Sequence, residues 1–244
     1  MENQNRSNPT IHSLIVLTYT RADLVTARIG ELTRIFGSDP NVEIVVFDNG
    51  STNLEVKLAL SNVPPSVRVE RVQDNLGFGG GWNEAVSRST GDFIHLISDD
   101  VRVYGNIVAH IERNLGNRPM WTGSGTGLVV GQTIVGPKAG WNEFAGTTIE
   151  YLMGHYLVMA REVWSALEGF DTETFHPNDY EDMDLSHRAR QAGFDLVAIP
   201  DLPIEHLVAG TIGYNPTRYE HTVKMRAAFA KKWNLQNIPT RPGE

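Results

Sequence analysis

The first hundred residues alternate between short apolar runs and helical patterns, and this alternation constrains the fold more than any other feature of the chain. Residues 21–36 (RADLVTARIGELTRIF) carry their apolar side chains at helical spacing, and residues 81–89 (GWNEAVSRS) predict a short helix behind several glycines. Strands separated by helices predict an α/β fold with a mostly parallel sheet flanked by helices. The apolar runs of buried-strand length are 11–18 (IHSLIVLT), 42–48 (VEIVVFD), 67–72 (VRVERV) and 92–98 (DFIHLIS).

The second half of the chain is less regular. The glycine-rich residues 122–136 predict loop mixed with short strands, and residues 148–160 (TIEYLMGHYLVMA) predict one longer strand. We expect a single domain over residues 11–235, in which the part after residue 117 packs on the same sheet, with polar tails at 1–10 and 236–244. Further elements are expected as helices at 161–170, 180–194 and 216–233 and as a strand at 195–200.

Composition excludes several classes of protein. The chain has 244 residues and a formal net charge of −8, which argues against a nucleic-acid partner. It has no cysteine, so disulfides, thiolate metal sites and cysteine nucleophiles are excluded. The segment MENQNRSNPT lacks the apolar core of a secretory signal, and no apolar run reaches the roughly 18 residues of a membrane span. We therefore expect a cytoplasmic protein and leave peripheral contact with a membrane open.

Polar motifs follow three of the predicted strands: TYTR (18–21), FDNGST (47–52) and SDDV (98–101). In parallel sheets, ligands bind at the carboxyl ends of the strands. Asp99 and Asp100 stand at such an end, where paired carboxylates suit Mg²⁺ or Mn²⁺, although an aspartate there would also cap a following helix. Asp48 would accept hydrogen bonds from a nucleobase or ribose, or would close a plain turn.

The glycine-rich segment NLGFGGGWNEAV (75–86) stands before a predicted helix. Glycines let the backbone approach a ligand closely, and a helix N-terminus favours phosphate. The segment does not follow the first strand, as a dinucleotide fingerprint would, so a flexible turn is the alternative.

Four acids gather in NDYEDMDL: Asp179, Glu181, Asp182 and Asp184. They complement the dipole of a helix that begins there, or one of them serves as a general base that removes a proton from an attacking hydroxyl. His206, after the strand-like segment PIE, is structural or a further metal ligand.

Taken in order along the chain, these motifs resemble the inverting nucleotide-sugar glycosyltransferases of family 2, which have the GT-A fold. The resemblance covers about residues 11–235. It is carried by the segments LTYTRADL, VVFDNGST, NLGFGGGWNEAV, LISDDV, GHYLVMAREVW, YEDMDLSHRARQAGFDLVAIP and EHLVAGT.

The resemblance implies transfer of a sugar from a nucleoside diphosphate sugar, most often a UDP-sugar, to a hydroxyl of a carbohydrate or lipid-linked glycan, in polysaccharide or glycoconjugate synthesis. Residues 11–117 would form the nucleotide-sugar-binding half and residues 118–235 the acceptor-side half. The donor-site residues it implies are Thr18, Tyr19, Arg21, Asp48, Gly79, Gly80, Asn83 and Asp99.

The resemblance also assigns the reactive groups. Asp182 matches the catalytic base, with Glu181 beside it in the acceptor site. Asp100 matches the last acid of the metal-binding Asp-x-Asp motif and His206 a late histidine that completes the sphere of Mn²⁺ or Mg²⁺. Ser98 replaces the first acid of that motif, so metal affinity without nucleotide should be low.

Two other functions remain open at this stage. A sugar nucleotidyltransferase would share the sheet and the metal, but it would carry a glycine-rich basic signature after the first strand, where TYTRADL has no glycine. A non-catalytic nucleotide-sugar-binding module would keep the donor pocket and lack the base, whereas YEDMDL is intact. The sequence leaves the donor sugar, the acceptor and the oligomeric state undetermined.

The C-terminal segment 216–233 predicts a basic amphipathic helix. Its cations would face anionic lipid, or its apolar residues would pack on the domain and leave a solvated outer face. The cations are Arg218, Lys224, Arg226, Lys231 and Lys232, and the apolar residues are Val223, Ala227, Phe229 and Trp233.

Overall fold

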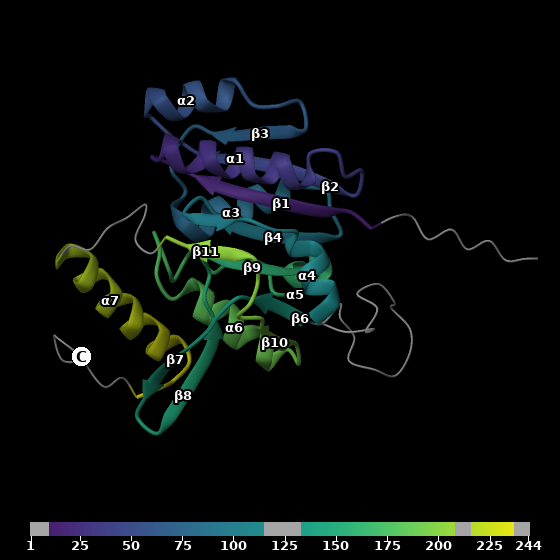
Figure 1. Ribbon diagram of the computed structural model, residues 1–244. Coiled ribbons are helices and arrows are strands. Elements are labelled where there is room, and N and C mark those ends of the chain that lie inside the picture. Colours follow the sequence, from purple (N-terminus) through teal and green to yellow (C-terminus); the bar gives the residue numbers. More distant parts are fainter. Residues whose placement is uncertain (1–9, 115–132, 208–215, 237–244) are drawn as a thin grey trace, which may run out of the picture.

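A seven-stranded mixed sheet forms the centre of the molecule (Figure 1). The computed structural model describes residues 10–114, 133–207 and 216–236, and the strand order is β10-β6-β9-β4-β1-β2-β3. Every pairing is parallel except those of β9, which runs antiparallel to β4 and β6. The strands are β1 (His12–Thr18), β2 (Val42–Asn49), β3 (Val67–Val72), β4 (Phe93–Ser98), β6 (Thr133–Gly136), β9 (Tyr156–Ala160) and β10 (Asp195–Ala198). The expected α/β fold with a mostly parallel sheet is confirmed.

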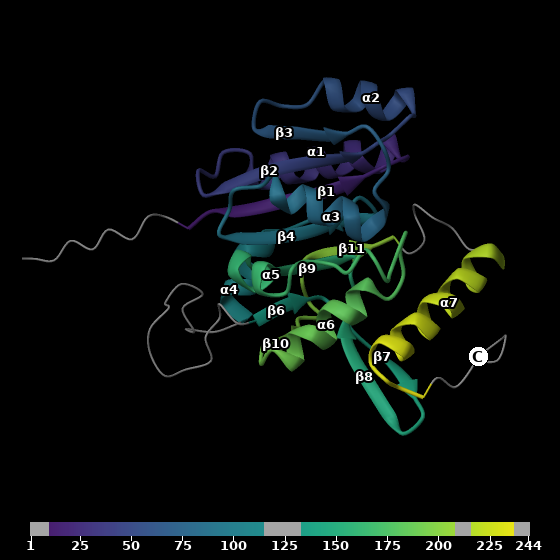
Figure 2. The same cartoon turned by 180° about the vertical axis from the view of Figure 1, so that it is seen from behind.

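Helices cover both faces of this sheet. α1 (Ala22–Phe36) lies on the face turned to the viewer in Figure 1, and α3 (Gly77–Ser87) lies on the opposite face, seen in Figure 2. Strand β1 is buried over its whole length, which explains its continuous apolar run. The remaining helices of this part are α2 (Leu54–Ser61), α4 (Ile107–Asn114), α5 (Arg161–Ala166) and α6 (Glu181–Gln191).

The segment 148–160 is not the single strand that its apolar character predicted. It forms β8 (Thr147–Leu152), a turn, and then β9, and the two strands belong to different sheets. β8 pairs with β7 (Ala139–Phe144) in an antiparallel hairpin, and β9 enters the central sheet. Apolar side chains on both sides of the turn gave the appearance of one continuous strand.

The glycine-rich segment is also different from the expected loop. Gly77, Gly79, Gly80 and Gly81 lie within α3, whose first residue is Gly77. Glycine is a poor helix former, so propensity pointed to a loop, but tertiary packing requires small residues here. A Cβ atom at Gly79 would stand 3.1 Å from Phe170 Cβ, and one at Gly81 would stand 2.7 Å from Asn49 Nδ2.

A second apolar cluster joins the β7–β8 hairpin to the C-terminal helix α7 (Pro216–Lys232), which lie side by side in both views (Figures 1 and 2). The cluster consists of Phe144, Ile149, Phe175, Met183, Met225, Phe229 and Ala230. A short antiparallel pair, β5 (Val101–Val103) with β11 (Ile204–His206), completes the fold. The expected boundary at residue 117 lies outside the described residues and stays a prediction.

The cations of α7 do not form one membrane-facing surface. Arg226 is buried, lies over the Phe144 ring at 4.3 Å and donates to Asn142 Oδ1 at 2.9 Å. Lys232 Nζ lies 2.7 Å from Asp184 Oδ1, and Arg218 Nη2 lies 3.8 Å from Asp179 Oδ1. Among the described residues, no helix combines the length and apolar character needed to cross a bilayer. Contact with a membrane surface stays a prediction.

Three polar side chains form a chain inside the core. His12 Nδ1 and His95 Nε2 lie 2.9 Å apart, and His95 Nδ1 lies 2.8 Å from the hydroxyl oxygen of Tyr156. Burial lowers the pKa of His12 to about 4 and also depresses the pKa of His95 well below its usual value. The folded protein therefore holds both imidazoles neutral at acidic pH.

We expect this pair to make the fold sensitive to acid. Unfolded histidines protonate near pH 6.5, whereas the folded ones resist, so the free energy of unfolding should fall from about pH 6.5 toward pH 4. The variant His95→Gln keeps a hydrogen-bonding side chain but cannot be protonated. Urea unfolding across this pH range should show a lower stability at pH 7 and a shallower acid decline than in the wild type. Equal acid slopes for the two proteins would contradict the assignment.

Candidate functional site

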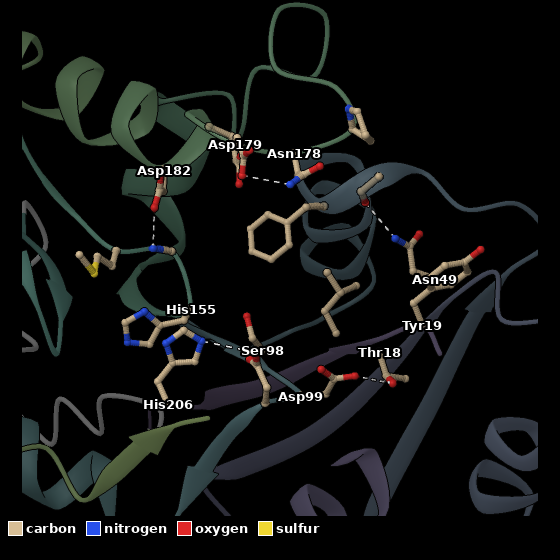
Figure 3. Close-up of a pocket in the computed structure, with 18 of the residues that line it drawn as sticks. Thr18, Tyr19, Asn49, Ser98, Asp99, His155, Asn178, Asp179, Asp182 and His206 are labelled. Carbon is tan, nitrogen blue, oxygen red and sulfur yellow. Dashed lines mark hydrogen bonds and ion pairs between the residues drawn. The ribbon is translucent and has the colours of Figure 1, made fainter. Parts of the chain in front are cut away.

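A cavity of about 710 Å³ opens at the carboxyl ends of the central strands (Figure 3). Parallel pairing of β1 with β2 and β4 brings three strand ends to one edge, since Leu17 pairs with Phe47 and with Ser98. One side of the cavity, here called the sheet wall, consists of Thr18, Tyr19, Asn49, Ser98, Asp99 and Asp100. The opposite side, the α6 wall, consists of Asn178, Asp179, Glu181 and Asp182.

The sheet wall contains three of the expected donor-site residues. Thr18 donates its hydroxyl to Asp99 Oδ2 at 2.9 Å, which fixes one of the paired acids. Tyr19 lines the cavity, and its carbonyl oxygen accepts a hydrogen bond from the Ser51 hydroxyl. Arg21 is partly exposed, does not line the cavity, and forms an ion pair with Asp23 at 2.6 Å. The hydrogen bond to Asp23 is the main cause that raises its pKa, and the charges of Asp99 and Asp100 add to it.

Asp48 lies outside the cavity, contrary to expectation. Its side chain is fully buried, Oδ1 accepts from the backbone N–H of Ser51 at 2.8 Å, and Oδ2 lies 3.4 Å from Arg71 Nη1. Successive side chains of a strand point to opposite faces, so the neighbouring Asn49 reaches the cavity instead. Asp48 thus holds the turn after β2.

Gly79, Gly80 and Asn83 also lie away from the cavity. Asn83 Nδ2 donates to the Phe170 carbonyl at 2.9 Å and its Oδ1 accepts from the Phe170 N–H at 2.9 Å. Gly77 lines the cavity in place of the other glycines. This position requires glycine, because its φ is +74° and a Cβ there would stand 2.8 Å from the Pro177 carbonyl oxygen. The next N–H, of Phe78, donates to that oxygen at 2.7 Å and joins α3 to the loop before α6.

Asp100 and His206 come together at the base of the cavity, as the sequence predicted. His206 Nε2 lies 3.4 Å from Asp100 Oδ2, because β11 pairs with β5 directly after Asp100. The ring of His155 stacks on that of His206, with centroids 4.2 Å apart and an angle of 2° between the planes. Burial lowers the pKa of His155 to about 4.

A carboxylate and an imidazole are ligands that Mn²⁺ and Mg²⁺ accept. Within the described residues, no group of three or more His, Cys, Asp and Glu side chains is placed to hold a metal ion. The pair therefore fits a metal that takes most of its ligands from a bound anion and water, as Mg²⁺ does in phosphate sites.

The α6 wall holds two acids whose pKa values are raised. Burial raises the pKa of Asp182 to about 6, against the opposing effect of the Gly154 and Met183 N–H groups, which donate to its two oxygens at 2.8 and 2.7 Å. Burial and the charge of Asp182 raise the pKa of Glu181 well above its usual value. Glu181 Oε2 is buried and has no hydrogen-bond partner in the described part of the chain. Asp182 can thus lose and regain a proton near neutral pH.

Several lining residues were not predicted from the sequence. His155, Gly154 and Tyr151 come from the β8–β9 turn and the end of β8, a region expected to be a continuous strand. Asn178 and Arg218 approach from the loop before α6 and from α7. The interruption of the apolar pattern by Gly154-His155 was the one available signal for the first group.

Comparison with known proteins gives a match to one family model and a shared fold. Residues 13–116 match the model described as glycosyl transferase family 2. No curated protein matches the chain. The likenesses to solved structures are below 25% identity and establish a shared fold of the GT-A type.

Three solved structures illustrate this fold. The mannosyltransferase PcManGT from Pyrobaculum calidifontis, in complex with GDP-Man and Mn²⁺, is 18% identical with a TM-score of 0.64, over 96% of this chain and 67% of that chain. GalNAc-T7 with UDP, GalNAc and Mn²⁺ is 14% identical with a TM-score of 0.66, over 90% of this chain and 48% of that chain. TarS (residues 1–349) of S. aureus is 14% identical with a TM-score of 0.57, over 91% and 72% of the two chains.

Gly154 offers a test of the α6 wall. A Cβ atom at this position would stand 2.9 Å from Asp182 Cβ and 3.3 Å from Oδ2, so Gly154→Ala should displace Asp182 and weaken its bond from the 154 N–H. Because that bond favours the ionised form, its loss should raise the pKa of Asp182 above about 6. The measurement is a ¹³C NMR titration of aspartate carboxyl groups.

The matched control is Gly30→Ala, where an added Cβ meets nothing within 4 Å. That variant should leave the titration unchanged, whereas Gly154→Ala should also cost about 1–3 kcal/mol of stability from overpacking. If Asp182 in Gly154→Ala titrates at the same pH as in the wild type, then Gly154 is not needed for the environment of Asp182.

Proposed function

We propose that this protein, whose residues 13–116 match the model described as glycosyl transferase family 2, is a glycosyltransferase that moves a sugar from a nucleoside diphosphate sugar to an acceptor hydroxyl with inversion at the anomeric carbon. One observation carries the proposal: a single cavity has the Asp100–His206 pair on one side and Asp182, with a pKa near neutrality, on the other (Figure 3).

The sheet wall is the proposed donor site. The matched family segment ends at residue 116 and so contains all six residues of this wall. Tyr19 offers its hydroxyl to a nucleoside, and Thr18 holds Asp99 toward the cavity. The Asn49 amide supports this wall, because it donates to the Gly77 carbonyl oxygen at 2.9 Å and accepts from the Leu76 N–H at 3.1 Å. The complexes of PcManGT with GDP-Man and of GalNAc-T7 with UDP support a nucleotide sugar in this fold. UDP is the first carrier to test, with GDP and dTDP as alternatives.

Asp100 and His206 would hold Mn²⁺ or Mg²⁺ together with the diphosphate of the donor. The bound cation would supply charge stabilisation for the departing diphosphate. Ser98, which replaces an acid at the edge of this pair, offers a neutral oxygen, so the protein should hold the metal weakly until nucleotide arrives. An acidic protein would in this way accept an anionic donor.

The α6 wall is the proposed acceptor side. Asp182 would accept the proton of the attacking hydroxyl, and its raised pKa suits a group that must be ionised before attack and protonated after it. Burial and the charge of Asp182 raise the pKa of Glu181, so this side chain would in its protonated form donate a hydrogen bond to the acceptor. A single displacement from the face opposite the diphosphate inverts the anomeric centre. The acceptor is proposed to be a carbohydrate or lipid-linked glycan, in polysaccharide or glycoconjugate synthesis.

The environment of Asp182 also favours an enzyme over a binding module. A site that only holds a nucleotide sugar has no need of a carboxyl group with a pKa near neutrality on the wall opposite the diphosphate. Slow hydrolysis of nucleotide sugars in the presence of Mn²⁺ would distinguish the two, since a binding module would release no nucleoside diphosphate. A nucleotidyltransferase would instead release pyrophosphate from a nucleoside triphosphate.

Removing the base tests the central assignment. Asp182→Asn keeps the shape of the side chain but cannot take a proton, so kcat for transfer or donor hydrolysis should fall by about 10²–10⁴-fold with unchanged affinity for the nucleotide. In the wild type, kcat should fall as the pH drops below about 6, because Asp182 becomes protonated. The measurements are steady-state kinetics across pH and nucleotide binding by calorimetry.

The control for this test is Asp195→Asn, which removes one exposed carboxylate at the start of β10. It should retain wild-type kinetics. Near-normal turnover by Asp182→Asn would show that another group serves as the base.

Removing the metal ligand tests the donor site without any measurement of activity. UDP, GDP or dTDP with Mn²⁺ should raise the melting temperature of the wild type, and EDTA should abolish that rise. Asp100→Asn should lose the Mn²⁺-dependent part of the shift, whereas Glu205→Gln, exposed on the same strand as His206, should keep it. An unchanged nucleotide shift in EDTA would show that Asp100 and His206 do not bind through a metal.

A further inference from the structure

The backbone immediately before α6 adopts a conformation that side chains rarely accept. Asp179 and Tyr180 are consecutive residues with φ of 72°, in the left-handed region. Neither is glycine, so both residues are strained in this conformation. Such a pair persists only where the surrounding structure fixes it, and it stands directly before Glu181 and Asp182.

Helix α7 supplies the groups that fix this turn. Thr222 Oγ1 donates to Asp179 Oδ2 at 2.6 Å, and His221 Nε2 lies 2.7 Å from the carbonyl oxygen of Asn178. Arg218 Nη2 lies 3.8 Å from Asp179 Oδ1, which also accepts from Asn178 Nδ2 at 3.1 Å. The C-terminal end of α7 is also bound to α6. Lys232 Nζ and Trp233 Nε1 lie 2.7 and 3.0 Å from Oδ1 of Asp184, a residue of α6.

We propose that Asp179 and Thr222 are positioning residues for Asp182: the Thr222 hydroxyl holds the Asp179 carboxylate in the strained turn, and the turn sets the orientation of Asp182 and places a second negative charge before it. The inference rests on the proposed function, in which Asp182 is the base. It assigns to α7 a role in the reaction, although apart from Arg218 at its start no residue of the helix lines the cavity.

The charged and polar groups around Asp182 support this role. Its own helix contributes Glu181, the preceding segment contributes Asp179, and the phenols of Tyr151 and Tyr180 approach from β8 and from the turn. Gly154 donates from the β8–β9 turn and opposes them, while Arg218 of α7 acts on Glu181. Burial is the main cause of the raised pKa of Asp182, and the charge of Asp179 raises it further.

The variant Asp179→Asn removes the charge and keeps an oxygen that can accept from Thr222. Without the like charge, the ionised form of Asp182 is favoured, so the acid limb of the kcat profile should move to lower pH by on the order of one pH unit. The ¹³C titration of the Asp182 carboxyl, assigned with Asp182→Asn, should move in the same direction. Glu220→Gln removes a carboxylate from the exposed side of α7 and should change neither measurement.

The variant Thr222→Val removes the hydroxyl and keeps the shape of the side chain. Loss of a hydrogen bond to a charged group should lower kcat about tenfold without changing the nucleotide-induced rise in melting temperature. Thr222→Ser keeps the hydroxyl and should restore the wild-type rate, whereas a role in packing alone would make Ser the more damaging change.

Equal losses in Thr222→Val and Thr222→Ser, or a pH profile and titration of Asp179→Asn that coincide with the wild type, would overturn the inference. A wild-type protein that transfers and hydrolyses no donor would defeat the proposed function separately. In that case the carboxyl titration, which needs no turnover, would still support or overturn the coupling between Asp179 and Asp182.

Discussion

The position of β1 between β2 and β4 determines where every group of the sheet wall lies. All three strands are parallel and in register, so Thr18, Asn49 and the Ser98–Asp100 segment reach the same edge of the sheet. The strands are apolar over nearly all of their length, and the polar side chains begin where the core ends. The hydrogen bond from Thr18 to Asp99 follows directly from this register.

Five carboxyl groups line the cavity, and different contacts reduce the repulsion between them. Asp99 accepts from Thr18, Asp100 lies beside His206, and Asp179 is held by groups of α7. Burial raises the pKa of both Glu181 and Asp182, which makes their ionised forms less favourable. The acids that are stabilised by partners thus lie beside the two whose pKa values are raised, and the charge of Asp179 acts on Asp182.

Continuous apolar runs made β1, β2 and β4 predictable, because a strand buried on both faces needs no alternation. The motifs at the ends of β1 and β4 placed Thr18, Asp99 and Asp100 at one edge of the sheet, and the acidic motif at the start of α6 placed Asp182 in the same cavity. Asp48 was misplaced by a single residue, since the pleat sends Asn49 rather than Asp48 to the cavity.

The remaining errors arise from contacts between distant parts of the chain. The glycine-rich segment was predicted as a loop but is part of helix α3. Its glycines allow α3 to pack closely against Phe170 and Asn49, and a local sequence pattern does not reveal such contacts. The same holds for Thr222, whose bond to Asp179 spans 43 residues of sequence, and for His155, whose stacking on His206 depends on the β5–β11 pairing.

The antiparallel entry of β9 has a consequence for how such a protein can diversify. Since β9 doubles back beside β4, the walls of the cavity come from separate stretches of polypeptide: the sheet wall from residues before 101, and the opposite wall from the β8–β9 turn, the start of α6 and α7. The β7–β8 hairpin and α7 pack around an apolar cluster of their own, separate from the main core. The hydrogen bond from Phe78 to Pro177 is one link between the two parts. Insertions or replacements in that apolar cluster can therefore reshape one flank of the cavity while the sheet wall keeps its geometry.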